Sequence, residues 1–266
     1  MMKQYLEGLQ QILDAGVDRE GRNGKTRALF GMQMRYNLED GFPAVTTKKL
    51  AFQSVKAELL GFIRGYDHVK QFQKLGTKIW NANAAAWGRS GALGCIYGVQ
   101  WRRWRTENGR VDQLADVIEQ IKEEPNSRRH IVTAWNPGEL DQMALAPCHM
   151  FFQFFVADGK LSLQMYQRSC DMFLGVPFNI ASYSLLLSMV AQLTDLQPSE
   201  FVHVLGDAHI YHAHFDQVKE QIQRQPYPLP ELVLNTDVTS IDNFRIQDLQ
   251  LKDYQHHDAI RARMIV

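Results

Sequence analysis

The spacing of hydrophobic and polar positions predicts helices and strands that follow one another without regular order. Apolar residues recur every three or four positions over residues 3–15, 50–64 and 113–124, which is typical of amphipathic helices. Residues 180–193 are apolar on all sides, so we expect a buried helix there. Strands are expected over residues 30–37, 131–135, 151–156, 161–167 and 201–205. Because regular βαβ alternation is missing, the pattern predicts an α+β fold with one large mixed, twisted β-sheet flanked by helices.

Composition fits one soluble domain. The chain has 266 residues, enough for a single domain over residues 1–266 with its own core. The formal net charge is zero, so bulk nucleic-acid binding is not expected and a bound anion needs individual arginines. Three cysteines without framework spacing favour a reducing compartment. We find no signal peptide and no run of about 18 apolar residues, and therefore expect a cytoplasmic protein without a membrane span.

Reactive side chains concentrate around one predicted hairpin. Cys148 precedes the aromatic strand 151–156, Asp158 and Gly159 form a turn, and Arg168 ends the returning strand. The hairpin should therefore bring Cys148 close to Arg168. A guanidinium beside a thiol lowers its pKa and favours a nucleophilic thiolate. The alternative for Cys148 is an unreactive cysteine packed in the interior. We interpret both Cys95 and Cys170 in this way.

Basic and acidic residues offer further candidates, each with a structural alternative. Residues 19–27 form a polar, glycine-rich, basic segment that is either a solvated loop or a phosphate clamp. Arg128 and Arg129 are adjacent at a strand start and cannot both face one core, so they form a surface pair or bind a ligand. Glu58 lies on an apolar helix, where a solvated surface charge is the usual interpretation.

Two polar rings near the end of the last predicted strand suit a sugar. His209 and Tyr211 are two residues apart, which places both on one side of an extended segment. A zinc site formed by His209, His212 and His214 is the alternative. We disfavour it because no cysteine or acidic residue has ligand spacing with them.

Three motifs together resemble the thymidylate synthase family. They are Ala146-Pro147-Cys148-His149, the run from Gln167 to Asp171, and Gly175-Val-Pro-Phe-Asn-Ile-Ala-Ser-Tyr183. The resemblance extends over nearly the whole chain and is densest between Ser127 and Pro230. It implies reductive methylation of dUMP to dTMP by 5,10-methylenetetrahydrofolate. The folate would be carbon donor and reductant, dihydrofolate the second product, and no metal would be needed.

Two alternatives remain beside this activity. A hydroxymethylase on the same scaffold would add water to the exocyclic methylene intermediate and release 5-hydroxymethyl-dUMP. A catalytically idle nucleotide- or RNA-binding relative is the second. The presence of Cys148, Arg168, Asn179, His209 and Tyr211 together argues against it.

The resemblance also implies roles for single residues. Cys148 would add to carbon 6 of the pyrimidine and Glu58 would order water and move protons. Asn179 would bond the uracil edge, because an amide both donates and accepts there. Catalytic roles are implied for Cys148, Glu58, Arg168, Asn179, Tyr97, His149 and Asp171. Nucleotide contacts are implied for Arg22, Arg128, Arg129, Gln167, Arg168, Ser169, Cys170, Asp171, Asn179, His209 and Tyr211. Folate contacts are implied for Ile79, Trp80, Asp171, Leu174, Phe178 and Ile265.

The family pattern further implies a homodimer and is not matched everywhere. Arg128 and Arg129 would reach the phosphate of the neighbouring subunit's nucleotide, so the active site would be shared. The segment around Arg22 departs from the usual family pattern. Gly61 stands where the family often has tryptophan, and nothing local explains a glycine inside a helix.

Overall fold

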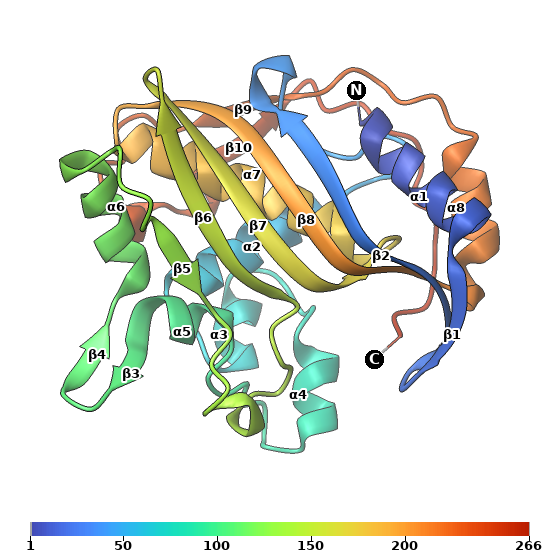
Figure 1. The fold of residues 1–266 in the computed structure, drawn as a ribbon, viewed down its shortest axis with the longest axis horizontal. Helices are drawn as coiled ribbons and strands as arrows, with labels where there is room; N and C mark the ends of the chain where they lie inside the picture. Colours follow the sequence, from blue (N-terminus) through green and yellow to red (C-terminus); the bar gives the residue numbers. More distant parts are fainter. Residues whose placement is uncertain (1, 266) are drawn as a thin grey trace.

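A six-stranded sheet forms the centre of the molecule, which the computed structural model describes for residues 2–265 (Figure 1). Its strand order is β1-β2-β8-β7-β6-β5. β7 and β8 run parallel and the other neighbours are antiparallel, so the predicted large mixed sheet is confirmed. The strands are β1 (Val17–Gly21), β2 (Gly24–Asn37), β5 (Ile131–Thr133), β6 (His149–Ala157), β7 (Lys160–Asp171) and β8 (Gln197–Tyr211). Two small hairpins join β3 (Trp104–Thr106) to β4 (Gly109–Val111) and β9 (Glu231–Leu234) to β10 (Leu249–Lys252).

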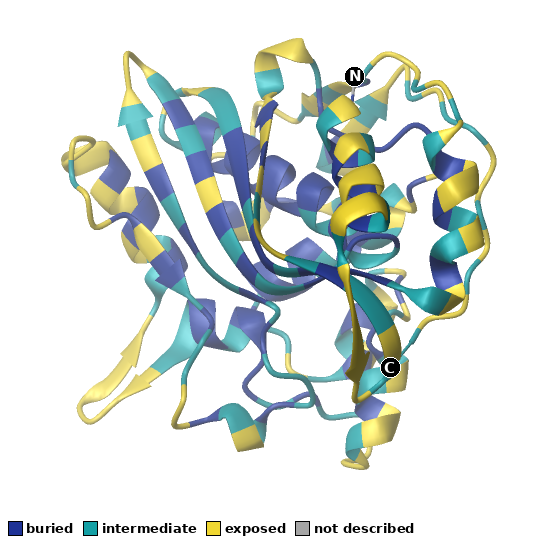
Figure 2. Cartoon of the chain, turned by 45° about the vertical axis from the view of Figure 1, so that its right-hand side comes forward, coloured by how far each residue is buried: buried dark blue, intermediate teal, exposed yellow. Residues whose placement is uncertain are grey.

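Helices cover one face of this sheet. α7 and α2 lie behind it in Figure 1, while the opposite face of the central strands is uncovered. Buried residues concentrate in the sheet and in the helix behind it, and the outer helices and hairpin loops carry the exposed ones (Figure 2). The helices are α1 (Lys3–Ala15), α2 (Phe52–Ile63), α3 (Val69–Lys74), α4 (Asn81–Trp87), α5 (Tyr97–Arg103), α6 (Gln113–Glu123), α7 (Gly175–Leu193) and α8 (Phe215–Ile222). Short 3₁₀ turns cover Leu38–Asp40, Leu140–Gln142, His212–His214, Ile241–Asn243 and Ile246–Asp248.

α7 is the central core helix. It begins at Gly175, five residues before the predicted start at Ile180, with Pro177 in its first turn, where a missing N–H leaves no helical bond unmade. By length and composition α7 could cross a membrane, which corrects the expectation that no such run exists. However, 78% of its most apolar window is buried in the fold. The hydrophobic surface of α7 therefore packs against β7 and β8.

The predicted loop over residues 19–27 is instead a hairpin. β1 pairs with the start of β2, with Arg19 opposite Thr26, and Arg22 and Asn23 lie at the tip. Gly24 has φ of +120°, a conformation that glycine adopts readily. All residues of β1 are exposed, so this edge strand carries no apolar alternation from which it could be predicted.

Close packing of Phe72 explains Gly61. A Cβ at Gly61 would lie 2.2 Å from Phe72 Cε1. The Phe72 ring is buried and meets Phe62 edge to face with centroids 6.0 Å apart. The ring thus occupies the space that a side chain at position 61 would need.

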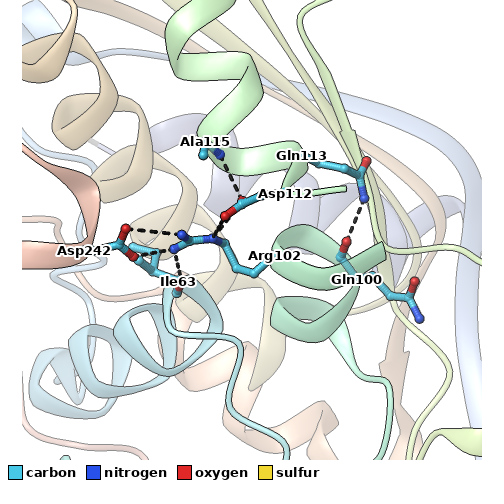
Figure 3. Close-up of polar contacts among 7 residues, drawn as sticks. All are labelled: Ile63, Gln100, Arg102, Asp112, Gln113, Ala115 and Asp242. Carbon is cyan, nitrogen blue, oxygen red and sulfur yellow. Dashed lines mark hydrogen bonds and ion pairs between the residues drawn. The ribbon is translucent and has the colours of Figure 1, made fainter. Parts of the chain in front are cut away.

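Arg102 connects helices α2, α5 and α6 through hydrogen bonds. Its guanidinium donates to both carboxylate oxygens of Asp112, at 2.8 and 3.0 Å, to the carbonyl of Ile63 and to Asp242 (Figure 3). Asp112 also caps α6 by accepting from the amide of Ala115. These bonds join α2, α5, α6 and the turn at Ile241–Asn243. They fix α5, whose first residue, Tyr97, reaches the candidate site.

Candidate active site

The β6–β7 hairpin places Cys148 and Arg168 together, as predicted. The amide of Arg168 donates to the carbonyl of Cys148 at 2.8 Å. The Arg168 side chain also donates to the preceding segment, from Nε to Pro147 O at 2.8 Å and from Nη2 to Ala146 O at 2.9 Å. The guanidinium therefore holds in place the segment that carries the thiol.

The pKa of Cys148 does not follow the expected direction. Burial raises the pKa of the thiol, while the positive charge of Arg168 and a hydrogen bond with Tyr97 lower it without compensating fully. The expectation of a net decrease considered the guanidinium alone and is wrong, because desolvation of the thiolate outweighs it. In the unliganded protein the sulfur is accordingly protonated near neutral pH.

Two stacked rings, those of Tyr97 and His149, adjoin Cys148. The Tyr97 hydroxyl accepts the amide N–H of Cys148 at 2.8 Å. The Tyr97 ring stacks on His149, with centroids 4.0 Å apart and planes 18° apart. Burial lowers the pKa of His149 to about 3, so its imidazole is neutral at physiological pH. His149 can therefore act there as a hydrogen-bonding group but not as a cation.

Glu58 lies beside Trp80, whose ring meets that of Tyr97 with centroids 5.8 Å apart. Trp80 Nε1 donates to Glu58 Oε1 at 3.0 Å. Burial raises the pKa of Glu58 to about 7, and the Trp80 bond opposes this only in part. Such a carboxyl can both accept and release a proton at physiological pH. A carboxyl with this raised pKa is not the solvated surface charge that the sequence offered as the usual interpretation of Glu58.

The start of α7 adds an acceptor and an amide. Asp171, the last residue of β7, accepts from the amides of Phe173 at 3.0 Å and Leu174 at 3.1 Å through Oδ1. Asn179 lies in the second turn of α7, and its side-chain amide has no hydrogen-bond partner among residues 2–265. Leu174 and Phe178 are partly exposed beside it. The arrangement offers hydrogen bonds next to an apolar surface.

β8 brings two polar rings to the same end of the sheet. His209 lies opposite Asp171 in the parallel pairing of β7 and β8. Its Nδ1 is 3.1 Å from Asp207 Oδ1, and its ring meets Tyr211 edge to face at 5.2 Å. The extended conformation predicted for this pair is confirmed, since both residues belong to β8.

The three histidines weighed as zinc ligands have separate partners. His209 contacts Asp207, His212 Nε2 contacts Asp18 at 3.0 Å, and His214 Nε2 contacts the carbonyl of Arg263 at 2.9 Å. Among residues 2–265, no group of three or more histidine, cysteine or acidic side chains is arranged to hold a metal ion.

Some predicted residues are buried and bonded within the protein. Gln167 is buried, and its amide is engaged by Ser169 O at 3.0 Å and by His203 Nε2 at 2.9 Å. The thiol of Cys170 is buried and donates to the carbonyl of Gln167 at 3.2 Å, in keeping with an inert cysteine.

Other predicted residues are exposed or partly exposed. Arg22 is at the exposed tip of the β1–β2 hairpin, where Nε donates to Asn23 at 2.9 Å. Arg128 and Arg129 are exposed just before β5. Ile79 and Ile265 are partly exposed, the latter in the irregular C-terminal segment.

Lys48 is a residue of the site that sequence reasoning missed. Its ammonium donates to the carbonyl of Phe173 and lies 3.5 Å from the centroid of the Phe173 ring. Burial lowers its pKa to about 7, and the neighbouring Asp171 opposes this. In the sequence it is one of two adjacent lysines in an irregular stretch, so no pattern separates it from a surface residue.

A thiol held by an arginine, a carboxyl whose pKa is about 7 and an unengaged side-chain amide are the kinds of groups that enzymes use for covalent catalysis. A family model, thymidylate synthase, matches residues 3–266. The chain therefore belongs to the thymidylate synthase family. The family consists of transferases that bind dUMP and use methylenetetrahydrofolate as co-substrate, and the chain is an enzyme of this type.

Proposed function

We propose that this enzyme methylates dUMP reductively to dTMP and releases dihydrofolate. The observation that carries the proposal is the position of Cys148. Arg168 fixes the thiol segment from one side and Tyr97 from below. Glu58, with a pKa near 7, is bonded to Trp80, whose ring contacts Tyr97.

The nucleotide would be held by charged groups around the hairpin. Arg168 uses Nε and Nη2 on backbone carbonyls, which leaves Nη1 for a phosphate oxygen. Ser169 follows on the same strand, and Arg22 approaches from the tip of the β1–β2 hairpin. At the sugar, His209 bonds the Asp207 carboxylate through Nδ1, which leaves its Nε2 to bond a hydroxyl.

The covalent step begins with loss of the Cys148 thiol proton, for which the Glu58 carboxylate is the proposed acceptor, and joins the sulfur to the pyrimidine ring. The sulfur of Cys148 forms a bond to carbon 6, and the electron pair of the C5=C6 bond moves toward carbon 5 and the oxygen on carbon 4. Carbon 5 thereby becomes a nucleophile. The amide of Asn179 donates to that oxygen and accepts from the ring N3–H, a pairing that fits uracil. Glu58 moves the protons, because its pKa allows both directions near pH 7.

The chain also offers a surface that suits a reduced folate. Leu174, Phe178 and Ile79 are partly exposed apolar side chains, and Trp80 lies behind them with its indole bonded to Glu58. Asp171 uses Oδ1 within the protein and keeps Oδ2 for the amino groups of a pterin. The bound folate supplies the one-carbon unit and the hydride.

The active unit would be a homodimer that buries the uncovered face of the sheet. Phe155 is 64% exposed and Ile131 is 46% exposed, on the neighbouring strands β6 and β5. Exposed aromatic and aliphatic residues of this kind favour association of two copies. Arg128 and Arg129 lie just before β5 and would reach the phosphate in the partner. Three free cysteines favour a cytoplasmic location.

The product distinguishes methylation from hydroxymethylation. Purified enzyme is mixed with dUMP and methylenetetrahydrofolate, the nucleotide is analysed by mass spectrometry, and dihydrofolate is followed by absorbance. The proposal expects dTMP with an equal amount of dihydrofolate. 5-Hydroxymethyl-dUMP without dihydrofolate would refute methylation and identify water as the final reactant. Bound dUMP without turnover would refute both.

A further inference from the structure

A tyrosine of α7 contacts His149, the residue that follows Cys148 in the chain. Tyr183 is 2% exposed, and its hydroxyl lies 2.6 Å from His149 Nδ1. Tyr183 and Asn179 are four residues apart on α7 and therefore share one face of the helix. One helix thus presents the amide for the pyrimidine edge and the hydroxyl that holds the imidazole.

The direction of this hydrogen bond follows from the protonation states of the two rings. Burial, together with the nearby charge of Glu58, raises the pKa of Tyr183 well above its usual value, so its hydroxyl keeps its proton. Among residues 2–265, the hydrogen-bond partner of this hydroxyl is His149 Nδ1. The hydroxyl therefore donates to Nδ1, and the neutral imidazole carries its own proton on Nε2.

The second ring nitrogen of His149, Nε2, has no hydrogen-bond partner among residues 2–265. Both ring nitrogens of His130 and Nδ1 of His203 are sealed in the interior without partners, but Nε2 of His149 is not among these closed-off atoms. His149 follows Cys148 in the chain and stacks on Tyr97, whose hydroxyl holds the Cys148 amide. An N–H on Nε2 is therefore a hydrogen-bond donor next to the nucleophile.

We propose that Tyr183 is a positioning residue that fixes His149 in the Nε2–H tautomer. When the sulfur of Cys148 bonds to carbon 6, negative charge collects on the oxygen of carbon 4, and the Nε2–H of His149 stabilises it directly or through one water. No proton is transferred in this contact. The identity of the oxygen rests on the proposed function, whereas the tautomer rests on the contact with Tyr183 alone.

The tautomer can be measured without any ligand. The full-length protein is labelled with ¹⁵N-histidine, and long-range ¹H–¹⁵N correlation spectra separate protonated from unprotonated ring nitrogens. A His149→Gln variant assigns the signals. We expect a protonated Nε2 and an unprotonated Nδ1 in the original protein, and an exchange-averaged pair of signals in Tyr183→Phe.

Tyr36→Phe is the matched control. Tyr36 is also 2% exposed and stacks on the same ring as Tyr183, since Phe201 lies 6.0 Å from Tyr36 and 6.1 Å from Tyr183. The Tyr36 hydroxyl contacts only the sulfur of Met34, at 3.2 Å, among the described residues. We expect the control to keep the His149 signals unchanged, and melting temperatures of both variants establish that they fold.

Kinetics supply the second measurement. Tyr183→Phe is expected to lower kcat by about 10-fold and to leave KM for dUMP within about twofold, because the lost donor acts on charge that develops during the reaction. Tyr36→Phe should change neither value. A protonated Nδ1 in the original protein, or unchanged signals and kcat in folded Tyr183→Phe, would overturn the proposal. If the original protein gives no product, the proposed function fails while the spectra still decide the tautomer.

Discussion

At Cys148 a nearby positive charge and burial in the protein shift the pKa of the thiol in opposite directions. Arg168 lowers the pKa of the thiol, but the loss of water around the sulfur raises it by more. At Glu58 the same desolvation raises a carboxyl pKa to about 7, and at His149 it lowers an imidazole pKa to about 3. Burial thus gives the cleft a protonated thiol, a proton carrier and a neutral ring.

Asn179 sets the base specificity in this account. Replacing it with aspartate (Asn179→Asp) removes the N–H₂ donor and adds an acceptor, which suits the amino group of cytosine. We expect kcat/KM for dUMP to fall by about 100-fold or more, since the carboxylate repels the oxygen on carbon 4. Product analysis with dUMP and dCMP measures the change. Undiminished activity on dUMP would refute the role of Asn179.

The raised pKa of Glu58 makes the stability of the folded protein depend on pH. Its pKa is about 7 in the folded protein against an ordinary value of 4.5, so the folded state binds more protons between these values. Stability therefore falls as pH rises through this window, and the cost is fully present above pH 7. Glu58→Gln keeps an acceptor for Trp80 but carries no charge.

We expect the Glu58→Gln variant to be more stable than the original protein by about 2 kcal/mol at pH 8 and to show no such advantage at pH 4.5. Denaturant unfolding at the two pH values checks this. Turnover of the variant should fall by about 100-fold or more, because its amide cannot move protons. Equal stability of the two proteins at pH 8 would contradict the raised pKa.

At the scale of elements, Arg102 connects several segments of the fold through its hydrogen bonds. It is 14% exposed and bonds two carboxylates and a carbonyl from three other segments (Figure 3). Arg102→Ala leaves these groups without their partner and is expected to destabilise the protein by about 2–4 kcal/mol. Urea unfolding measures the loss.

A surface ion pair provides the control for Arg102. Arg35 is 56% exposed and pairs with Glu200. Arg35→Ala should cost less than about 1 kcal/mol, because solvent screens exposed pairs. Similar losses for the two variants would show that the Arg102 bonds contribute no more than a surface contact.

Elements that bury one face or all faces could be predicted from the sequence. α1, α2 and α6 follow the apolar spacing within two residues at each end, since each buries one stripe of side chains. Strand β1 could not, because all its residues are exposed. The start of α7 lies in a Gly-Val-Pro segment that reads as a turn, and only the fold shows that Pro177 occupies a first helical turn.

The candidate site divides in the same way. The meeting of Cys148 and Arg168 follows from a local hairpin, so sequence spacing was enough to predict it. The roles of Glu58 and Asn179 came from the family resemblance. Lys48 and Tyr183 act through contacts with Phe173 and His149, which are 125 and 34 residues away in the chain. Such contacts depend on tertiary packing and leave no local pattern.

At the scale of the whole molecule, the proposed homodimer with a shared active site would account for both the uncovered sheet face and the exposed arginines before β5. Mixing two inactive variants tests this. Cys148→Ala lacks the nucleophile, and Arg128→Ala combined with Arg129→Ala lacks the donated cations. In a mixed dimer one site would have both parts.

Equal amounts of the two variants, unfolded and refolded together, should recover about a quarter of the original activity, because half of the dimers are mixed and each has one intact site. Each variant refolded alone is the control. Activity of the mixture no higher than the sum of these controls would contradict donation of Arg128 and Arg129 across the interface.

The most direct test of the central claim, attack of Cys148 on carbon 6, is hydrogen exchange at carbon 5 of dUMP. Reversible addition of the thiolate makes carbon 5 basic, so its hydrogen exchanges with solvent whether the final product is methylated or hydroxymethylated. The enzyme is incubated with 5-deuterated dUMP, and the nucleotide mass is followed over time with and without the folate. We predict loss of deuterium with the original protein and none with Cys148→Ala. Equal loss with the Cys148→Ala variant, or none with the original protein under conditions of turnover, would contradict the account.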